Sequence, residues 1–304
     1  MQNLLLLFGC LAAGLLLRRA GRVADDAHTA LNAVIVNLAL PALTLRTLHG
    51  FQFEAGHLWP VLMPWLLFAL GAAVFWLAGR WLGLSRASIG ALTLVGGLGN
   101  TSFVGLPMIE SLHGRDGLGL GLLIDQLGSY LALSTVGVLL ATAYAAEGRV
   151  TWRAMALKVF TFPPFVALVV ALLLRPLPFP SALDGALARL GDLLAPLALI
   201  SVGLQLRFDA ILSQARLLCL GLGYKLVACP ALVVAVLWLQ DAAPDMTNRV
   251  SVIEAAMPPM IGAGIVAAQA RLNAPLVSTL IGVGIPLGLG TATAWHWLFG
   301  WVAA

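Results

Sequence analysis

Helix-breaking residues interrupt a long apolar stretch in the first half of the chain. Residues 96–108 read GGLGNTSFVGLPM, so glycines, a proline and small polar side chains stand inside a segment apolar enough to cross a bilayer. A helix in lipid must satisfy its own backbone, and glycine and proline leave N–H and C=O groups without partners. Such groups are stable in a membrane only where protein buries them or a wet cavity solvates them. This stretch therefore predicts a broken helix packed against other helices.

A second interrupted stretch follows in the other half of the chain. Residues 254–264 read EAAMPPMIGAG, again within an apolar segment. Two interrupted hydrophobic segments at corresponding places in two halves are typical of secondary transporters built from inverted repeats. The pair predicts a site where the two breaks contribute backbone groups and small polar side chains.

Apolar segments run through the whole chain. Its residues are 61% hydrophobic and 10% charged, and the mean hydropathy is +0.97, whereas soluble domains are about a quarter charged. We expect an all-α polytopic membrane protein, with repeats over 1–146 and 147–304, whose fourth and ninth helices are broken. The ten predicted transmembrane helices lie near residues 2–19, 28–48, 57–82, 87–110, 117–146, 155–174, 182–204, 213–239, 247–270 and 275–301.

The basic residues predict the orientation of these helices. Eleven of the 17 Lys and Arg residues fall in loops after odd-numbered helices, and basic loops favour the cytoplasm. Both termini are therefore expected outside the cytoplasm, and five helices per half give the halves opposite orientations. Prolines also recur in matching order, with Pro41 and Pro64 answered by Pro196 and Pro230.

Several function classes find no support in the sequence. The basic residues are scattered, without the clustering of a nucleic-acid-binding face. Phosphate-binding loops, nucleophile–base pairs and metal-ligand spacing are absent from the sequence, and Cys10, Cys219 and Cys229 all stand in apolar segments. We expect neither an enzyme nor a protein with a resident cofactor, metal or nucleic-acid partner.

Asn100, Thr101 and Ser102 place three side-chain oxygens beside the first break. Freed carbonyls and hydroxyls at a break can coordinate a cation, while the N-terminus of the following half-helix favours an anion. The alternative is that these residues only recapture the backbone groups released by Gly105 and Pro107.

Four further polar residues stand inside predicted transmembrane helices. An ionised side chain in the membrane is costly, so Glu254, Asp125 and the adjacent Gln126 are candidates for ion coupling. The alternatives are a surface position for Glu254 and a helix-end or packing role for Asp125. Lys225 needs a partner, either Asp125 or Glu254 in a structural ion pair or an anionic substrate.

These motifs resemble the auxin efflux carrier family, in particular its short bacterial members. The resemblance covers essentially the whole chain. The matching residues are NTSFVGLP at 100–107, AMPP at 256–259, LALPAL at 38–43, APLALISVG at 195–203 and the pair Asp125-Gln126.

The resemblance implies the fold of bile acid–sodium symporters, in which helices four and nine cross at their breaks. It implies a scaffold of helices one, two, six and seven, through which homodimers form, and a transport domain of the other six helices. Alternating access would then carry small carboxylates, auxin-like acids among them, across a bacterial inner membrane, with both termini periplasmic.

We therefore predict a secondary active transporter of small organic anions. We expect transport to be coupled to H⁺ or driven by the membrane potential. Na⁺ is the alternative coupling ion, and it would bind at Asn100, Thr101, Gln126 and Glu254. A sodium-coupled symporter, a channel and a sensor that retains this fold are alternatives. The predicted substrate-binding residues are Asn100, Thr101, Ser102, Pro107, Lys225, Pro258 and Pro259, and the predicted ion-coupling residues are Asp125, Gln126 and Glu254.

Overall fold

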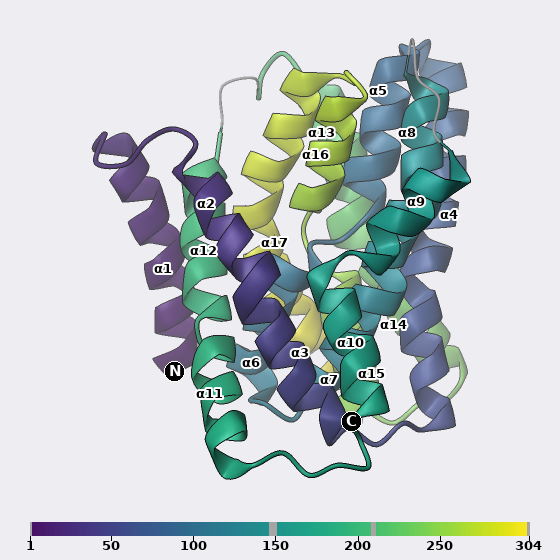
Figure 1. Cartoon of the computed structure of the whole chain (residues 1–304). Helices are drawn as coiled ribbons and strands as arrows, with labels where there is room; N and C mark the ends of the chain where they lie inside the picture. The colour runs from purple at the N-terminus through teal and green to yellow at the C-terminus, as the bar shows by residue number, and fades with distance from the viewer. Residues whose placement is uncertain (1, 146–150, 208–210, 303–304) are drawn as a thin grey trace.

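The computed structural model describes residues 2–145, 151–207 and 211–302, which fold into helices and connecting turns (Figure 1). The predicted repeat boundary between residues 146 and 147 lies outside the described residues. Six helical segments are long and apolar enough to cross a membrane, which confirms a polytopic membrane protein. They are Ala27–His49, Ala55–Leu82, Leu118–Tyr144, Ser181–Gln205, Ala215–Leu239 and Ala274–Trp301.

Several of these segments are built from consecutive helical elements. Their elements are α2 (Ala27–Val34), η1 (Ile35–Ala39) and α3 (Leu40–His49); η2 (Ala55–His57) and α4 (Leu58–Leu82); α7 (Leu118–Leu123), η5 (Ile124–Tyr130), η6 (Leu133–Gly137) and α8 (Val138–Tyr144); α11 (Ser181–Gly191) and α12 (Leu194–Gln205); α13 (Ala215–Gly223), η7 (Tyr224–Ala228) and α14 (Cys229–Leu239); and α17 (Ala274–Val302).

The remaining helices are shorter, and most belong to interrupted segments. The first break separates η3 from η4, and the second separates α15 from α16. The elements are α1 (Gln2–Arg19); α5 (Arg86–Ala91), η3 (Leu92–Gly96), η4 (Thr101–Gly105) and α6 (Leu106–His113); α9 (Trp152–Phe160) and α10 (Pro163–Leu173); and α15 (Met246–Ala255) and α16 (Ile261–Gln269).

One interruption was not predicted. The sequence favoured an unbroken helix over 155–174, but α9 and α10 meet at an angle of 62°. Phe162 between them is extended and precedes Pro163 and Pro164. A proline disfavours helical geometry at the residue before it, and it cannot donate a backbone hydrogen bond, so the chain bends there.

Three π-helical turns hold polar residues that the sequence singled out. Thr101 and Ser102 lie in η4, Asp125 and Gln126 in η5, and Lys225 in η7. A π-helical turn accommodates an extra residue and leaves the regular hydrogen-bond ladder, and such turns occur frequently at functional sites. Each of these turns therefore departs from the regular helix where a polar side chain is placed.

Helices from the start and the middle of the chain pack into a common group. α1 packs closely along α12, α3 packs against α10 and α11, and α2 also contacts α12 (Figure 1). A second group contains α4, α5, α8 and α13 to α17, together with the π-helical turns η3, η5 and η7. The two interrupted segments with α5 and α15 belong to this second group, and both breaks are buried. η4, just after the first break, contacts α12 of the first group.

The closest helix approach in the first group depends on two glycines. A Cβ atom on Gly14 of α1 would lie 2.2 Å from the Ile200 carbonyl oxygen, and one on Gly203 of α12 would lie 2.3 Å from the Leu11 carbonyl oxygen. Small residues allow backbones to approach in this way, which is how helices associate inside a membrane.

Gly14→Ala should therefore destabilise the protein by about 1–3 kcal/mol through overpacking. Thermal unfolding of the purified protein in detergent would measure the loss. Gly9→Ala on the same helix is the control, because nothing lies within 4 Å of a Cβ there and alanine favours helix. Equal melting temperatures for the two variants would contradict the close packing of α1 on α12.

Candidate functional site

The two interrupted segments cross and pair through their backbones. Gly99 and Pro259 form an isolated antiparallel bridge. The Asn100 N–H donates to the Pro258 carbonyl at 2.7 Å, and the Met260 N–H donates to the Leu98 carbonyl at 3.1 Å. Each break therefore satisfies backbone groups that the other leaves free, as the membrane interior requires.

Gly105 brings the first broken segment against a buried carboxyl group on the second. A Cβ atom at this position would lie 2.6 Å from Oε2 of Glu254. Any larger residue would push the Glu254 side chain or the half-helix away. The glycine thus leaves room for the Glu254 carboxyl group beside the half-helix.

Asn100 has both a structural contact and a free donor. Its Oδ1 accepts a hydrogen bond from the Phe103 N–H at 3.2 Å, which caps the second half-helix. Its side chain is buried, and its Nδ2 has no hydrogen-bond partner. The recapture of backbone groups is therefore real, but it uses only the oxygen and leaves the amide nitrogen for another partner.

Asp125 joins the π-helical turns η4 and η5. Its Oδ1 accepts hydrogen bonds from the hydroxyls of Thr101 and Ser102, each at 2.5 Å. The side chain is 1% exposed, so a position at a solvated helix end is wrong. The two hydroxyls compensate part of the cost of burying this carboxyl group.

Gln126 faces in a different direction from Asp125. Its Nε2 donates to Oγ1 of Thr44 in α3 at 2.8 Å, while its Oε1 is buried without a partner. Gln126 thus links the second helix group to the first at a buried position.

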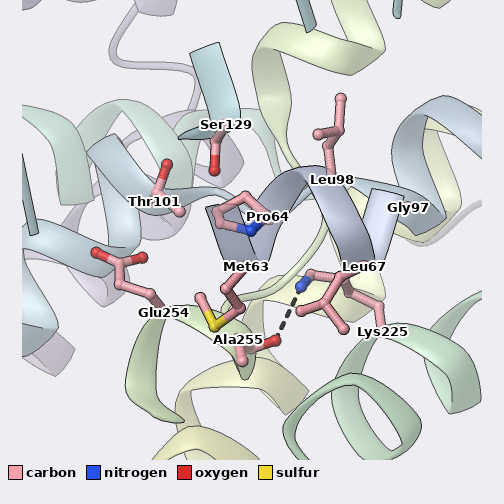
Figure 2. A pocket seen from close by; sticks show the side chains of 11 residues that line it. Met63, Pro64, Leu67, Gly97, Leu98, Thr101, Ser129, Lys225, Glu254 and Ala255 are labelled. Atoms are coloured by element: carbon pink, nitrogen blue, oxygen red, sulfur yellow. Dashed lines mark hydrogen bonds between the residues drawn. The ribbon is translucent and has the colours of Figure 1, made fainter. Parts of the chain in front are cut away.

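Glu254 is 2% exposed, so the alternative of a surface position is wrong. Neither carboxyl oxygen has a hydrogen-bond partner, although Thr101 and Ser129 lie nearby on the wall of the same small cavity (Figure 2). An ionised carboxylate buried without partners is very unfavourable. Glu254 is therefore suited to bind a proton or a small cation.

Lys225 contacts the second break without forming an ion pair. Its Nζ donates to the Ala255 carbonyl oxygen at 2.9 Å, and that oxygen belongs to the last residue of α15 (Figure 2). Among the described residues, no carboxylate oxygen lies within 4.0 Å of the ammonium. The expected structural ion pair with Asp125 or Glu254 is therefore wrong, and a helix C-terminus holds the cation in its place.

Two cavities lie beside the crossing. The smaller, about 10 Å³, is bounded by Thr101, Ser129, Lys225 and Glu254 together with Met63, Pro64, Leu67, Ala255 and residues 97–99. The larger, about 410 Å³, has the size of a small-molecule site. Its lining residues are Asn32, Val36, Asn100, Ser102, Phe103, Asp125, Tyr130, Leu133, Ser134, Lys158, Thr161, Phe162, Pro163, Met260, Ile261, Gly262, Ile265 and Val266.

The predicted site residues are divided between these spaces. Asn100, Ser102 and Asp125 line the larger cavity, and the smaller is lined by Thr101, Lys225 and Glu254. The other four line neither cavity: Pro107 in the first turn of α6, Gln126 beside Thr44, and Pro258 and Pro259 in the extended crossing.

Sequence reasoning missed the wall of the larger cavity formed by α9 and α10. The Tyr130 hydroxyl donates to the Lys158 carbonyl oxygen at 3.0 Å, and the Tyr130 ring stacks on Phe162 with centroids 3.8 Å apart. The adjacent prolines at 163 and 164 were the available signal, because they mark a bend that turns α9 towards the cavity.

Gly105→Ala should lower stability by about 1–3 kcal/mol, because the added Cβ meets the Glu254 carboxyl group. The loss should shrink in a Glu254→Ala background, and a double-mutant cycle on melting curves would measure the coupling. Gly223→Ala is the control, since its Cβ would meet nothing within 4 Å. An undiminished loss in the Glu254→Ala background would show that the contact is not what requires glycine.

Comparisons with known proteins agree with a membrane transporter. The profile of a family described as membrane transport protein matches residues 1–296. An uncharacterized transporter of Methanothermobacter thermautotrophicus is 27% identical, over 93% of this chain and 92% of the relative. An uncharacterized transporter of Methanocaldococcus jannaschii is 21% identical, over 91% of this chain and 92% of the relative.

Proposed function

Since the chain belongs to the membrane transport protein family, the auxin efflux carriers, we propose that it is a secondary active transporter of small organic anions. The predicted family is confirmed, and its description is that of a transporter. The substrate class, the coupling ion and the transport cycle are the further content of this proposal. It includes no enzymatic step.

The observation that carries the proposal is the larger cavity beside the crossing. Its wall combines Asn100 and Ser102 from the first broken segment with Met260, Ile261 and Gly262 from the second. Broken helices that meet at a cavity are how secondary transporters form substrate sites within the membrane. A substrate in this cavity would touch both interrupted segments at once.

The donors on the cavity wall favour an anion. Ile261 and Gly262 begin α16, whose N-terminus has no side-chain cap, and free N–H groups at a helix start attract negative charge. The Nδ2 of Asn100 adds a donor without a partner. A carboxylate, which accepts several hydrogen bonds, matches this set.

The division into two helix groups supports alternating access. We propose that α1 to α3 and α9 to α12 form the scaffold, also the homodimer contact, and that the other helices move. Polar contacts between the groups include Gln126 with Thr44 and, at 2.5 Å, Arg115 with Asp192. Movement would break such contacts while each group keeps its own packing, in two inverted five-helix repeats.

In the proposed orientation both termini lie outside the cytoplasm of a bacterial cell, in its inner membrane. The larger cavity then opens towards the cytoplasm, because Lys158 and Asn32 lie near the predicted cytoplasmic ends of their helices. Arg115 and Asp192 then lie on the opposite side, where their ion pair helps to close the interface between the two groups.

Asn100→Ser tests the substrate site. A serine can still cap the half-helix, but it lacks the amide donor, and losing a hydrogen bond to a charged group costs about 1.5–3 kcal/mol. We expect the dissociation constant for succinate or butyrate, measured by ligand-induced thermal stabilisation, to rise about tenfold or more above the wild-type value. Counterflow in proteoliposomes should slow correspondingly.

Asn37→Ser is the matched control, because Asn37 is exposed and donates only to Ala33 of its own helix. Normal binding and counterflow by Asn100→Ser at wild-type expression would contradict the assignment of the crossing as the substrate site. Unitary currents in bilayer recordings would favour a channel instead, and binding without counterflow would favour a sensor.

Glu254 is the proposed coupling residue, with a proton as the coupling ion. Both of its oxygens lack partners, and protonation would remove the cost of the buried charge. Na⁺ is the alternative, since Thr101 and Ser129 add hydroxyl oxygens around the same small cavity. The Lys225 ammonium, which borders this cavity, already supplies one positive charge there.

Glu254→Gln should flatten the dependence of transport on pH, because the amide keeps the shape but binds no proton. Initial uptake rates between pH 5.5 and 7.5, with and without Na⁺, would measure the effect. Asp116→Asn in an exposed loop is the control. An unchanged pH profile with a lost Na⁺ response would move the assignment to sodium coupling, and two unchanged profiles would exclude Glu254 from coupling.

A further inference from the structure

Lys158 lies on the wall of the larger cavity, on α9 rather than on the crossing. We infer that Lys158 is a specificity residue that binds a second anionic group of the substrate, so that dicarboxylates bind more tightly than monocarboxylates of the same length. This inference rests on the proposed function and adds a residue and a preferred substrate class to it.

The charges on the cavity wall support this role. Among the lining residues Lys158 is the one basic side chain and Asp125 the one acidic side chain. The carboxyl group of Asp125 already accepts two hydroxyl hydrogen bonds, whereas no carboxylate of the described residues lies within 4.0 Å of the Lys158 ammonium. Lys158 is an exposed residue that borders the cavity, and its ammonium has no counter-ion among the described residues, so it can pair with an anion that binds there.

The main chain of Lys158 is held in place from the other helix group. The Tyr130 hydroxyl in η5 donates to its carbonyl oxygen, and Tyr130 stacks on Phe162 just after α9. These contacts fix the start of the side chain relative to η5, the turn that also contains Asp125. The ammonium can then meet a ligand whose other end lies at the crossing.

The remaining wall explains why two charged ends suit this cavity. Phe103, Leu133, Phe162 and Val266 offer no strong donors, so they can pack the carbon chain of a ligand. Neutral hydroxyl and amide groups of Asn32, Tyr130, Ser134 and Thr161 also border the cavity, but Lys158 is its one cationic lining residue. A monocarboxylate can bind at the crossing alone, whereas the second carboxylate of a dicarboxylate can also pair with Lys158. The alternative is a lysine whose ammonium only reaches for water at the membrane surface.

The test compares length-matched acids on the purified full chain. Thermal stabilisation at pH 7.5 would give dissociation constants for succinate against butyrate and for malonate against propionate. We expect wild type to prefer each dicarboxylate by about tenfold, which is the effect of one hydrogen bond to a charged group. Lys158→Gln should abolish the preference and leave monocarboxylate binding unchanged, and Lys158→Arg should retain it.

Arg153→Gln is the control, because Arg153 is an exposed basic residue on the same helix that does not line the cavity. Loss of the preference in this variant as well would reduce the effect to general surface charge and overturn the inference. A wild type that binds both acids of each pair equally, or a Lys158→Gln variant that weakens both equally, would also overturn it while the proposed function stands. Absence of binding by any acid would overturn the organic-anion function itself.

Discussion

The requirement that every backbone polar group be satisfied inside a membrane governs this structure. Two segments break within the apolar part of the chain, and each places N–H and C=O groups where lipid offers no partner. The bridge between Gly99 and Pro259 gives the free backbone groups of both breaks hydrogen-bond partners. Since each break depends on the other, the two halves of the chain must meet at this point, and the surrounding helices pack around it.

The same crossing determines which side chains can lie beside it. The absence of a side chain at Gly105 leaves the space that the Glu254 carboxyl group occupies, and Asn100 caps the half-helix that starts at the break. Lys225 reaches the end of α15, where a carbonyl oxygen is free. The positions of these polar groups therefore depend on the two broken helices. Because they contact the breaks and one another, substitution of one residue should change the packing of its neighbours.

The sequence was sufficient to predict both breaks, the membrane class and the polar residues worth attention. Glycine, proline and buried carboxylates carry a physical cost in lipid that can be judged without coordinates. The partners of those residues could not be predicted, because Lys225 with Ala255 and Gln126 with Thr44 depend on how distant helices face each other. The adjacent prolines at 163 and 164 could have predicted the bend before Pro163. That the bend places Lys158 on the cavity wall could be seen only in the folded structure.

Asp125 offers a physical route between the proposed ion site and the proposed substrate site. Its Oδ1 accepts from Thr101, which borders the small cavity with Glu254, and from Ser102, which borders the larger cavity. Under the proposed coupling role of Glu254, a proton or cation bound there would change the field on Thr101, and the shared carboxyl group would pass that change to Ser102. Coupling between two ligands needs such a difference in interaction free energy. Thr101 and Ser102 are adjacent in the π-helical turn η4, yet Thr101 borders the small cavity and Ser102 borders the larger one. This turn therefore connects the two cavities through neighbouring side chains.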